Sequence, residues 1–428
     1  MIDCGGRRRA GPLHRWTAGA VLTFALLFPG LGGSVPFPGI DAWLAQAGAP
    51  PEKDGDHPLK LPAEGRSEAI VLHGFSHNDN PPGVPSPENG KKAGGSGGSA
   101  SGDEHPAHPQ SPREPLAFGS RAILDACWSG EELEADAPRL ERRGPTAVPE
   151  NLRTAVDFRI ARPPLPQSLR NSIRRVRPVG SGKPVALTFD LCETAGGVSG
   201  YDAGIVNWLR ANRVRATFFA GGKWMQTHPE QTLQLMADPL FEIGNHSWTH
   251  ANFRELGRSR MEEQVLRTQD QYRLLRGLLE SRECARRAGA RAMDDIPREP
   301  VLFRFPYGTC NAEALGFLAS RGLAAIQWDV VTGDASTSQT AGGIARIVLS
   351  RVKPGSIIVC HANRRGHGTA AALPLFVPRL REMGYDFVTV SELLASGTAE
   401  TSPDCYEERP GDNRKYDKIT GVGKHADH

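Results

Sequence analysis

Short apolar runs alternate with amphipathic stretches between residues 183 and 394. Runs of this kind are typical of buried strands, and they lie at residues 185–189, 216–220, 241–244, 301–305, 324–328, 356–359 and 387–390. The stretches between them predict helices, at residues 201–211, 229–236, 258–279, 311–320, 340–352 and 373–383. This alternation predicts parallel βα units that close, or nearly close, into a barrel, and an open doubly wound sheet fits it almost as well.

The first residues indicate an export signal. Several arginines precede an apolar run at residues 16–28, which is too short to cross a bilayer comfortably. Ala45-Gln46-Ala47 offers a small-x-small cleavage site, so we expect a signal peptide at residues 1–47. An uncleaved membrane anchor is the alternative. Either way, the working part of the chain is expected in the periplasm or outside the cell.

The remaining segments outside residues 183–396 are predicted from composition. Residues 48–117 are rich in Pro, Gly, Ser and charge, and they predict a disordered linker. Residues 118–182 predict a lead-in segment that packs on the main domain, with helices at 122–133 and 165–176. Residues 281–299 form a charged insertion before the fourth strand, and residues 397–428 a polar C-terminal tail.

Composition argues against two classes of partner. The net charge of the chain is only +3, and aromatic and basic residues do not interleave as a stacking platform would require. A nucleic-acid partner is therefore not expected. No Gly-x-Gly-x-x-Gly follows the first strand, and the Gly-rich phosphate loop is missing too. The lack of both motifs argues against a nucleotide cofactor.

Polar side chains follow several of the predicted strands, where the chemistry of parallel α/β proteins collects. His246 and His250 are four residues apart after the third strand, and on a helical turn this spacing puts both imidazoles on one side. The polar Ser247 and Thr249 between them favour a metal site over a core. Two unrelated histidines are the alternative.

Asp190 ends the first strand, and Arg304 ends the fourth. An Arg that fixes Asp190 would also keep it ionised near neutral pH. The turn that contains Tyr307 could present backbone N–H groups to an oxyanion. His361 ends the sixth strand, and an Asp at the end of the fifth, at position 329 or 334, could orient it.

These pieces, in this order, resemble the polysaccharide deacetylase family, whose domain is also called NodB homology. The resemblance covers residues 183–394, about half of the chain. It rests on counterparts of five family motifs: Thr188-Phe189-Asp190, His246-Ser247-Trp248-Thr249-His250, Arg304-Phe305-Pro306-Tyr307-Gly308, the segment from Trp328 to Asp334, and Ile358-Val359-Cys360-His361.

The resemblance implies a distorted (β/α)7 barrel that removes N-acetyl groups from amino sugars of an envelope or extracellular polysaccharide, such as peptidoglycan or chitooligosaccharide. It also implies a divalent metal, commonly zinc. The roles carried over are metal binding for His246 and His250 and catalysis for Asp190 as base, Arg304 as its anchor, Tyr307 as oxyanion donor through its backbone, and His361 as acid paired with Asp334.

Two positions depart from the family pattern. Leu191 stands where the family has a second Asp that binds the metal, and leucine cannot bind one. Glu193 is the replacement we expect first, with Cys192 or an additional water as alternatives. Ala335 follows Asp334 where the family has Trp, so an apolar wall of the sugar groove is expected to be missing.

Six cysteines follow the predicted cleavage site. They lack Cys-x-x-Cys spacing, which argues against a structural zinc knuckle, and they allow fifteen complete disulfide pairings. Cys192, Cys310 and Cys360 lie close to motifs and are expected to be buried neighbours of the site, with a disulfide between two of them as an alternative.

Two other functions remain open from the sequence. One is a catalytically impaired glycan-binding domain of the same fold, whose metal site was lost at Leu191. The other makes Cys192 a nucleophile activated by His361.

Overall fold

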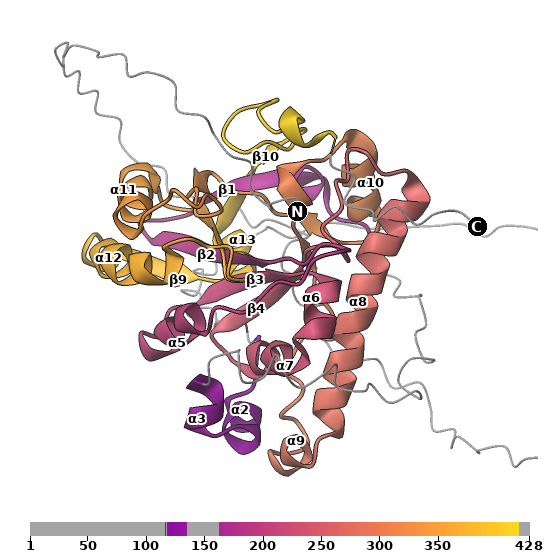
Figure 1. Cartoon of the computed structure of the whole chain (residues 1–428), viewed down its shortest axis with the longest axis vertical. Helices are drawn as coiled ribbons and strands as arrows, with labels where there is room; N and C mark the ends of the chain where they lie inside the picture. The colour runs from indigo at the N-terminus through magenta and orange to yellow at the C-terminus, as the bar shows by residue number, and fades with distance from the viewer. Residues whose placement is uncertain (1–115, 117, 135–161, 419–428) are drawn as a thin grey trace, which may run out of the picture. The chain divides into compact units, whose positions relative to one another are not determined.

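One curled parallel sheet organises the protein (Figure 1). The computed structural model describes residues 116, 118–134 and 162–418. Among these, strands run in the order β6-β5-β4-β3-β2-β8-β7, with β9 paired to β2. Their bounds are Lys183–Leu191 (β2), Ala216–Ala220 (β3), Phe241–Asn245 (β4), Leu302–Phe303 (β5), Ala324–Ala325 (β6), Val330–Val331 (β7), Ile357–His361 (β8) and Tyr385–Val388 (β9). The predicted distorted barrel of parallel βα units is confirmed, as a curled sheet whose path ends at β6 and β7.

β2 lies in the middle of the sheet because it pairs with three strands, β3, β8 and β9. All its residues from Val185 to Leu191 are buried. A strand buried on both faces needs apolar residues at successive positions, which explains the continuous run in the sequence. Phe189 stacks on Phe218 of β3 with ring centres 5.2 Å apart, and Phe218 meets Phe241 of β4 edge-on at 5.1 Å. These rings join the three central strands.

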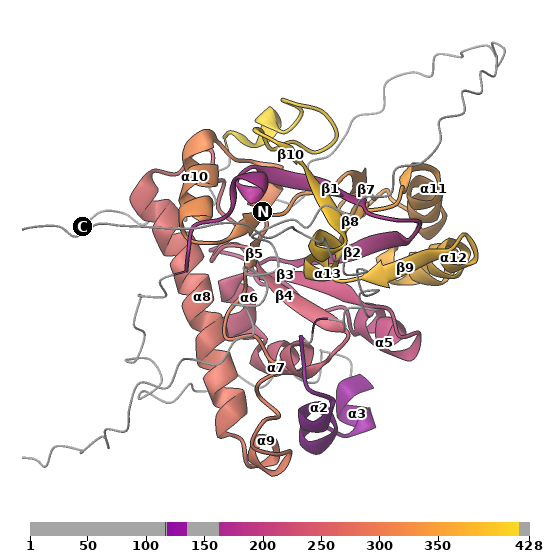
Figure 2. The same ribbon diagram turned by 180° about the vertical axis from the view of Figure 1, so that it is seen from behind.

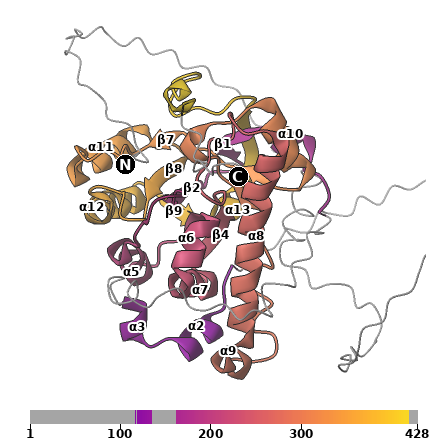
Figure 3. The same ribbon diagram turned by 45° about the vertical axis from the view of Figure 1, so that its right-hand side comes forward.

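Helices form the outer layer around the sheet, with the long helix α8 along one side (Figure 3). Each of the six predicted helices is present: Ala203–Ala211 (α5), Pro229–Ala237 (α7), Arg258–Ser281 (α8), Ala312–Ser320 (α10), Ala341–Arg351 (α11) and Thr369–Glu382 (α12). Polar side chains fix where several begin. Asp202 accepts from the backbone N–H of Ile205 at the start of α5, and Asn311 does the same for Ala314 at the start of α10. Two short helices, Gly222–Thr227 (α6) and Val390–Ala395 (α13), were not predicted.

The helix predicted at residues 165–176 is wrong. That stretch contains one 3-10 turn, Gln167–Leu169, followed by strand β1 (Ser172–Pro178). Ile173 and Val176 are both fully buried, at a spacing that reads as helical. The register of β1 shifts between Ile173 and Arg175, and this bulge lets both apolar residues face inward from a strand.

β1 pairs antiparallel with β10 (Gly397–Ser402), the first part of the predicted C-terminal tail (Figure 2). β1 also contacts the curled sheet at two places. It forms a bridge from Ile173 to Ile326, next to β6, and another from Arg175 to Ser356, next to β8. β1 therefore contacts the parallel sheet beside its end strand β6 and beside β8, the neighbour of the other end strand β7.

The lead-in residues 121–134 form two short helices, Arg121–Cys127 (α2) and Gly130–Glu134 (α3), where one was predicted. Cys127 forms a disulfide with Cys284 in α9 (Glu283–Arg287), inside the predicted charged insertion. Trp128 Nε1 also donates to Glu230 Oε1 in α7 at 2.5 Å. These contacts attach the lead-in to the outer helices.

The predicted signal peptide at residues 1–47 lies outside the described residues, as does the predicted linker apart from Leu116. Among the residues that are described, no helix combines the length and apolar character needed to cross a membrane.

Candidate active site

Asp190 and Arg304 form a buried ion pair at the carboxyl ends of the strands. Asp190 is the second-to-last residue of β2 and is 5% exposed, while Arg304 directly follows β5 and is 0% exposed. Arg304 Nη1 donates to Asp190 Oδ1 at 2.8 Å. Burial, the largest single effect, would raise the pKa of Asp190, but Arg304 together with His246 and His361 outweighs it and holds this pKa below its ordinary value. The carboxylate is therefore ionised at neutral pH.

The guanidinium of Arg304 is fixed by further contacts. Nη1 also donates to Thr188 Oγ1 at 2.8 Å, while Nε and Nη2 donate to the carbonyls of Ile326 and Gln327, each at 3.3 Å. The ring of Phe219 lies 4.0 Å from the guanidinium carbon. Because its donors are satisfied on several sides, Arg304 holds Asp190 in one position.

His246 and His250 come together, but not on the helical turn that their spacing predicts. The segment after β4 is an irregular loop in which Ser247 and His250 have φ angles of 65° and 57°. The Asn245 side chain accepts from the backbone N–H of Ser247 at 2.9 Å and so stabilises this loop instead of a helix. The two imidazole rings still lie 4.9 Å apart.

The hydrogen bonding of His246 determines which ring nitrogen is available to a ligand. Nδ1 donates to the carbonyl oxygen of Arg304 at 2.9 Å, so Nε2 carries the lone pair. Nε2 is buried, has no hydrogen-bond partner among the described residues and lies 3.6 Å from Asp190 Oδ2. Burial lowers the pKa of His246 to about 4, despite the opposing effect of Asp190. The imidazole is therefore neutral at physiological pH, as a metal ligand must be.

Cys192 joins the two histidines. Ligand atoms of Cys192, His246 and His250 all lie within 4.8 Å of one another, and all three residues are buried. Cys192 follows Asp190 by two residues, the spacing that places side chains on one face of a strand. Leu191 between them is fully buried in the hydrophobic core. The chain thus places a thiol beside the histidines, one residue beyond the leucine.

Glu193, the replacement ligand expected first, makes contacts in another place. Its carboxylate pairs with Lys223 Nζ at 3.2 Å and accepts from Thr227 Oγ1 at 3.0 Å and the Ser199 N–H at 3.3 Å. Lys223 also donates to three carbonyls of the loop at residues 194–197. Glu193 and Lys223 together stabilise this loop.

His361 and Asp334 form a second pair beside the first. His361 ends β8 and stands opposite Asp190 in the sheet register. Its Nδ1 donates to Asp334 Oδ1 at 2.9 Å, and its backbone N–H donates to Oδ2 at 2.7 Å. Of the two candidates at the end of the fifth strand, Asp334 is the one that contacts His361. Asp329 instead accepts from Ser356 and Ile357.

The turn at residues 306–308 carries Tyr307 in a left-handed backbone conformation, with φ of 58°. This conformation is unfavourable for a side chain of this size and tends to occur at functional sites. The Tyr307 ring meets the His250 ring at 4.4 Å. The turn therefore lies directly beside the histidine pair.

Comparison with known proteins adds to this geometry. The family model described as "Polysaccharide deacetylase" matches residues 178–281. A chitooligosaccharide deacetylase of Sinorhizobium fredii is 30% identical over 227 residues, which cover 50% of this chain and 93% of that protein. The chain belongs to the polysaccharide deacetylase family. The resemblance predicted from the five motifs is thus confirmed.

Other relatives of this polysaccharide deacetylase chain match over part of their length. A peptidoglycan-N-acetylglucosamine deacetylase of Listeria monocytogenes is 28% identical over 229 residues, or 54% of this chain and 42% of that protein, so the chain covers less than half of that relative. A solved structure from Bacillus anthracis, described as a CE4 family pseudoenzyme, is 24% identical with a TM-score of 0.42, covering 52% of this chain and 68% of that one.

A pocket opens at the strand ends of this family member. The motif residues Asp190, His250, Tyr307 and His361 line it. Further lining residues come from the predicted C-terminal tail, namely Glu407, Lys415 and Tyr416. Sequence reasoning missed these three because no periodicity or motif marks residues 403–418; only the aromatic and cysteine residues in this polar stretch signal a folded segment.

The disulfide considered between two of Cys192, Cys310 and Cys360 is not formed. Cys310 pairs with Cys405, and Cys192 and Cys360 are buried without a disulfide. The partner of Cys310 comes from residues outside the predicted domain, which explains why proximity to the motifs did not identify it. Burial raises the pKa of Cys360 well above its ordinary value, so its thiol is neutral.

Proposed function

We propose that this chain is a metal-dependent hydrolase that removes N-acetyl groups from amino sugars of peptidoglycan or a related envelope polysaccharide. The observation that carries the proposal is the pairing of two different catalytic groups on adjacent strands. Asp190 is held ionised by Arg304, and His361 is held by Asp334 directly across the sheet. Membership of the family and relatives named for peptidoglycan and chitooligosaccharide deacetylation support the substrate class.

The residues beside Asp190 fit a divalent metal such as zinc. His246 Nε2 and His250 Nδ1 are buried without a hydrogen-bond partner among the described residues. Two imidazoles and a thiolate are ordinary zinc ligands. We therefore assign Cys192 as the third ligand, in place of Glu193. A metal bound there would lower the pKa of a water molecule and polarise the acetamide carbonyl.

The side chains around the metal ligands divide the proton transfers between them. Asp190 takes the proton of the attacking water, because Arg304 keeps its carboxylate ionised. The backbone N–H of Tyr307 supports the negative charge that develops on the carbonyl oxygen. His361 gives a proton to the departing amine, and Asp334 stabilises the protonated ring through its bond to Nδ1.

Action outside the cytoplasm is part of the proposal. The described residues contain two disulfides, Cys127–Cys284 and Cys310–Cys405. Disulfides of this kind persist in oxidising compartments and are rare in the cytosol. They agree with the export signal predicted at the N-terminus.

Acetate release from chitooligosaccharides and from purified peptidoglycan tests the proposal. We expect release by the full-length protein, its loss with a chelator and its return when zinc is added. The His246→Ala variant should be inactive under all three conditions. Activity that survives both chelation and His246→Ala would exclude a metal mechanism.

The position of Leu191 favours a second candidate, a glycan-binding domain without catalysis. Leu191 lies fully in the core, so the position of the family's metal-binding Asp contributes no ligand here. This candidate predicts that the protein binds oligosaccharides in calorimetry, releases no acetate, and gains no thermal stability from zinc. Stabilisation by zinc together with acetate release would exclude it.

Cysteine catalysis is the third possibility. Cys192 lies beside His246 and His250, whereas His361 is held by Asp334. A cysteine nucleophile needs no metal, so acetate release in the presence of a chelator separates the two roles of Cys192. Release that the chelator abolishes and zinc restores would exclude a metal-independent cysteine nucleophile.

A further inference from the structure

Residues 403–418 form a folded segment that continues from β10 to one side of the pocket. Three residues of this 403–418 segment, Glu407, Lys415 and Tyr416, line the pocket together with Asp190 and His250. The segment lies outside residues 178–281, which the family model matches.

Aromatic rings connect the 403–418 segment to the histidine pair. The ring of Tyr416 lies 5.2 Å from the ring of Tyr307 at an angle of 32°. Tyr307 in turn meets the ring of His250 at 4.4 Å. Tyr416 is only 7% exposed, so its ring fills space behind Tyr307 and does not present a free face to the solvent. Any movement of Tyr416 would remove packing from Tyr307, and Tyr307 packs on His250.

The same segment also holds the backbone of the turn that carries Tyr307. Asn413, which is fully buried, donates through Nδ2 to the carbonyl of Gly308. Asn252 bridges the two parts: its Oδ1 accepts from Thr309 Oγ1 at 2.6 Å, and its Nδ2 donates to the carbonyl of Tyr416 at 2.8 Å. A left-handed residue persists only where its surroundings enforce it, and these bonds supply that enforcement for Tyr307.

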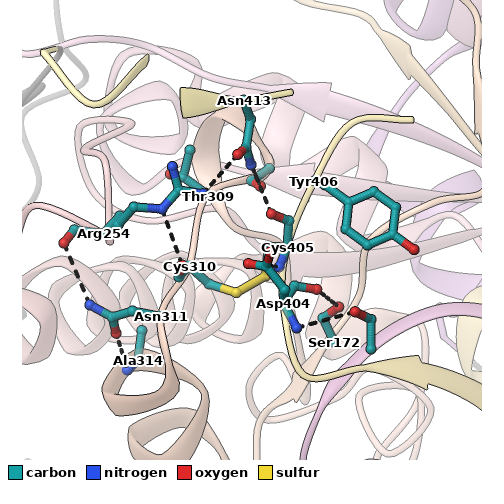
Figure 4. Close-up of a disulfide and its surroundings, with 12 residues drawn as sticks. Ser172, Arg254, Thr309, Cys310, Asn311, Ala314, Asp404, Cys405, Tyr406 and Asn413 are labelled. Carbon is teal, nitrogen blue, oxygen red and sulfur yellow. Dashed lines mark hydrogen bonds between the residues drawn. A yellow bond between two sulfur atoms is a disulfide. The ribbon is translucent and has the colours of Figure 1, made fainter. Parts of the chain in front are cut away.

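Covalent and ionic contacts fix the 403–418 segment itself (Figure 4). Cys405 forms a disulfide with Cys310, two residues after the turn. Arg254 donates to Asn413 Oδ1 at 2.7 Å and pairs with Asp417. These contacts tie the segment to the residues after the turn, through Cys310, and to the loop after β4, through Arg254.

Glu407 adds a polar contact beside the pocket. Its Oε1 accepts from the Tyr416 hydroxyl at 2.7 Å, and its Oε2 accepts from Lys415 Nζ at 2.8 Å. The Tyr416 ring is thus oriented at its hydroxyl by Glu407 and on its face by Tyr307.

We propose that Tyr416 is a positioning residue, through which the 403–418 segment holds Tyr307 and His250 in the geometry that the reaction requires. The inference rests on the proposed function, because it assigns Tyr307 to the oxyanion and His250 to the metal. Ala335 and Tyr416 both line the pocket, together with the aromatic residues Tyr307 and Trp328.

Three variants of the full-length protein test this inference. Tyr416→Ala removes the ring, Tyr416→Phe keeps the ring and removes the hydroxyl, and Tyr406→Ala is the matched control. Tyr406 belongs to the same segment but packs against Arg174, with 3.6 Å between the guanidinium carbon and the ring centre, and does not line the pocket. The readouts are kcat and KM for acetate release, zinc affinity of metal-stripped protein by titration, and melting temperature.

Tyr416→Ala should lower kcat by about tenfold or more, because a displaced oxyanion donor stabilises the transition state less. Its KM should change by less than about threefold and its zinc affinity should fall by at least about threefold, since His250 loses support. Tyr416→Phe should have the kcat and the zinc affinity of the wild type. Tyr406→Ala should lower the melting temperature while kcat and zinc affinity stay as in the wild type.

The inference is overturned if Tyr416→Ala keeps wild-type kcat and zinc affinity, or if Tyr406→Ala lowers both as strongly as Tyr416→Ala does. If Tyr416→Phe loses as much kcat and zinc affinity as Tyr416→Ala does, the inference is also overturned, since the ring would then not be the supporting group. Tyr416→Leu replaces Tyr416→Ala if the latter does not fold, with the same outcomes. If wild-type protein releases no acetate from any substrate, the proposed function fails, and the zinc titrations alone decide the role of Tyr416.

Discussion

Replacing Arg304 with Met would leave the Asp190 carboxylate buried without its cation. The pair lies where Asp190 is 5% and Arg304 0% exposed, so solvent cannot compensate for the loss. Thr188 Oγ1 and the carbonyls of Ile326 and Gln327 would lose a donor at the same time. Breaking a buried, hydrogen-bonded ion pair from one side costs about 3–5 kcal/mol, and we expect Arg304→Met to lower the free energy of unfolding by this amount.

The matched control is removal of both charges. Asp190→Asn alone leaves the Arg304 cation buried without its counter-ion, whereas the double variant leaves no buried charge in the pair. The double variant should therefore cost at least about 2 kcal/mol less than the two single variants summed. Urea unfolding of all four proteins at pH 7, in metal-free buffer, measures this coupling. A coupling below about 0.5 kcal/mol would refute the reasoning, because independent residues give values in that range.

The pH dependence of the same variants provides a second check. The pKa of Asp190 is lowered in the folded protein, so the pair contributes stability above the unfolded pKa of about 4, and this contribution is lost as the pH falls through the lower, folded pKa. The stability difference between the wild type and Arg304→Met should therefore shrink as the solution is acidified. A difference that stays constant down to the acid range would show that the cost comes from packing and not from charge.

Three further predictions concern metal binding, proton donation and a buried carboxyl. Cys192→Ser should weaken zinc binding by at least the roughly 10- to 100-fold that loss of a supporting residue costs; Glu193→Ala, its control, should leave the affinity unchanged in titrations, and the reverse result would make Glu193 the ligand. Asp334→Asn should lower kcat for acetate release by about tenfold or more with KM nearly unchanged. A variant that raises KM and leaves kcat unchanged would contradict the action of Asp334 through His361. Burial raises the pKa of Glu242 to about 7, so wild-type stability should fall by roughly 2 kcal/mol as pH rises from about 5 to 7. An unfolding series in which Glu242→Gln shows the same pH slope would contradict this.

The strand pattern is sufficient to predict the sheet and to predict that the motif residues lie close together. Parallel strands present their carboxyl ends at one edge, so Asp190, Arg304 and His361 had to come close once their strands were identified. Their mutual distances depend on strand register, which the apolar runs alone do not specify. The structure supplies these distances.

Other features depend on long-range contacts that leave little local signal. β7 has only two residues, Val330–Val331, and β1 contains a bulge that makes its apolar spacing look helical. Cys192, and not Glu193, lies beside the histidines because side chains alternate along an extended chain and because Glu193 pairs with Lys223, a residue remote in sequence. The 403–418 segment is polar and aperiodic, and only its contacts with the Tyr307 turn reveal its place in the site.

The position of β2 in the sheet has a consequence for how the chain folds. β2 is the first strand of the parallel sheet, yet two of its partners, β8 and β9, come near the end of the domain, and Lys183 pairs with Tyr385. Contacts so distant in sequence require closure of a long loop before they contribute any stability, and proteins dominated by them fold slowly. The central strand therefore cannot complete its pairing until nearly the whole domain has left the ribosome. A nascent chain of this topology stays unfolded for longer, which is the state in which a protein can be threaded across a membrane before it folds.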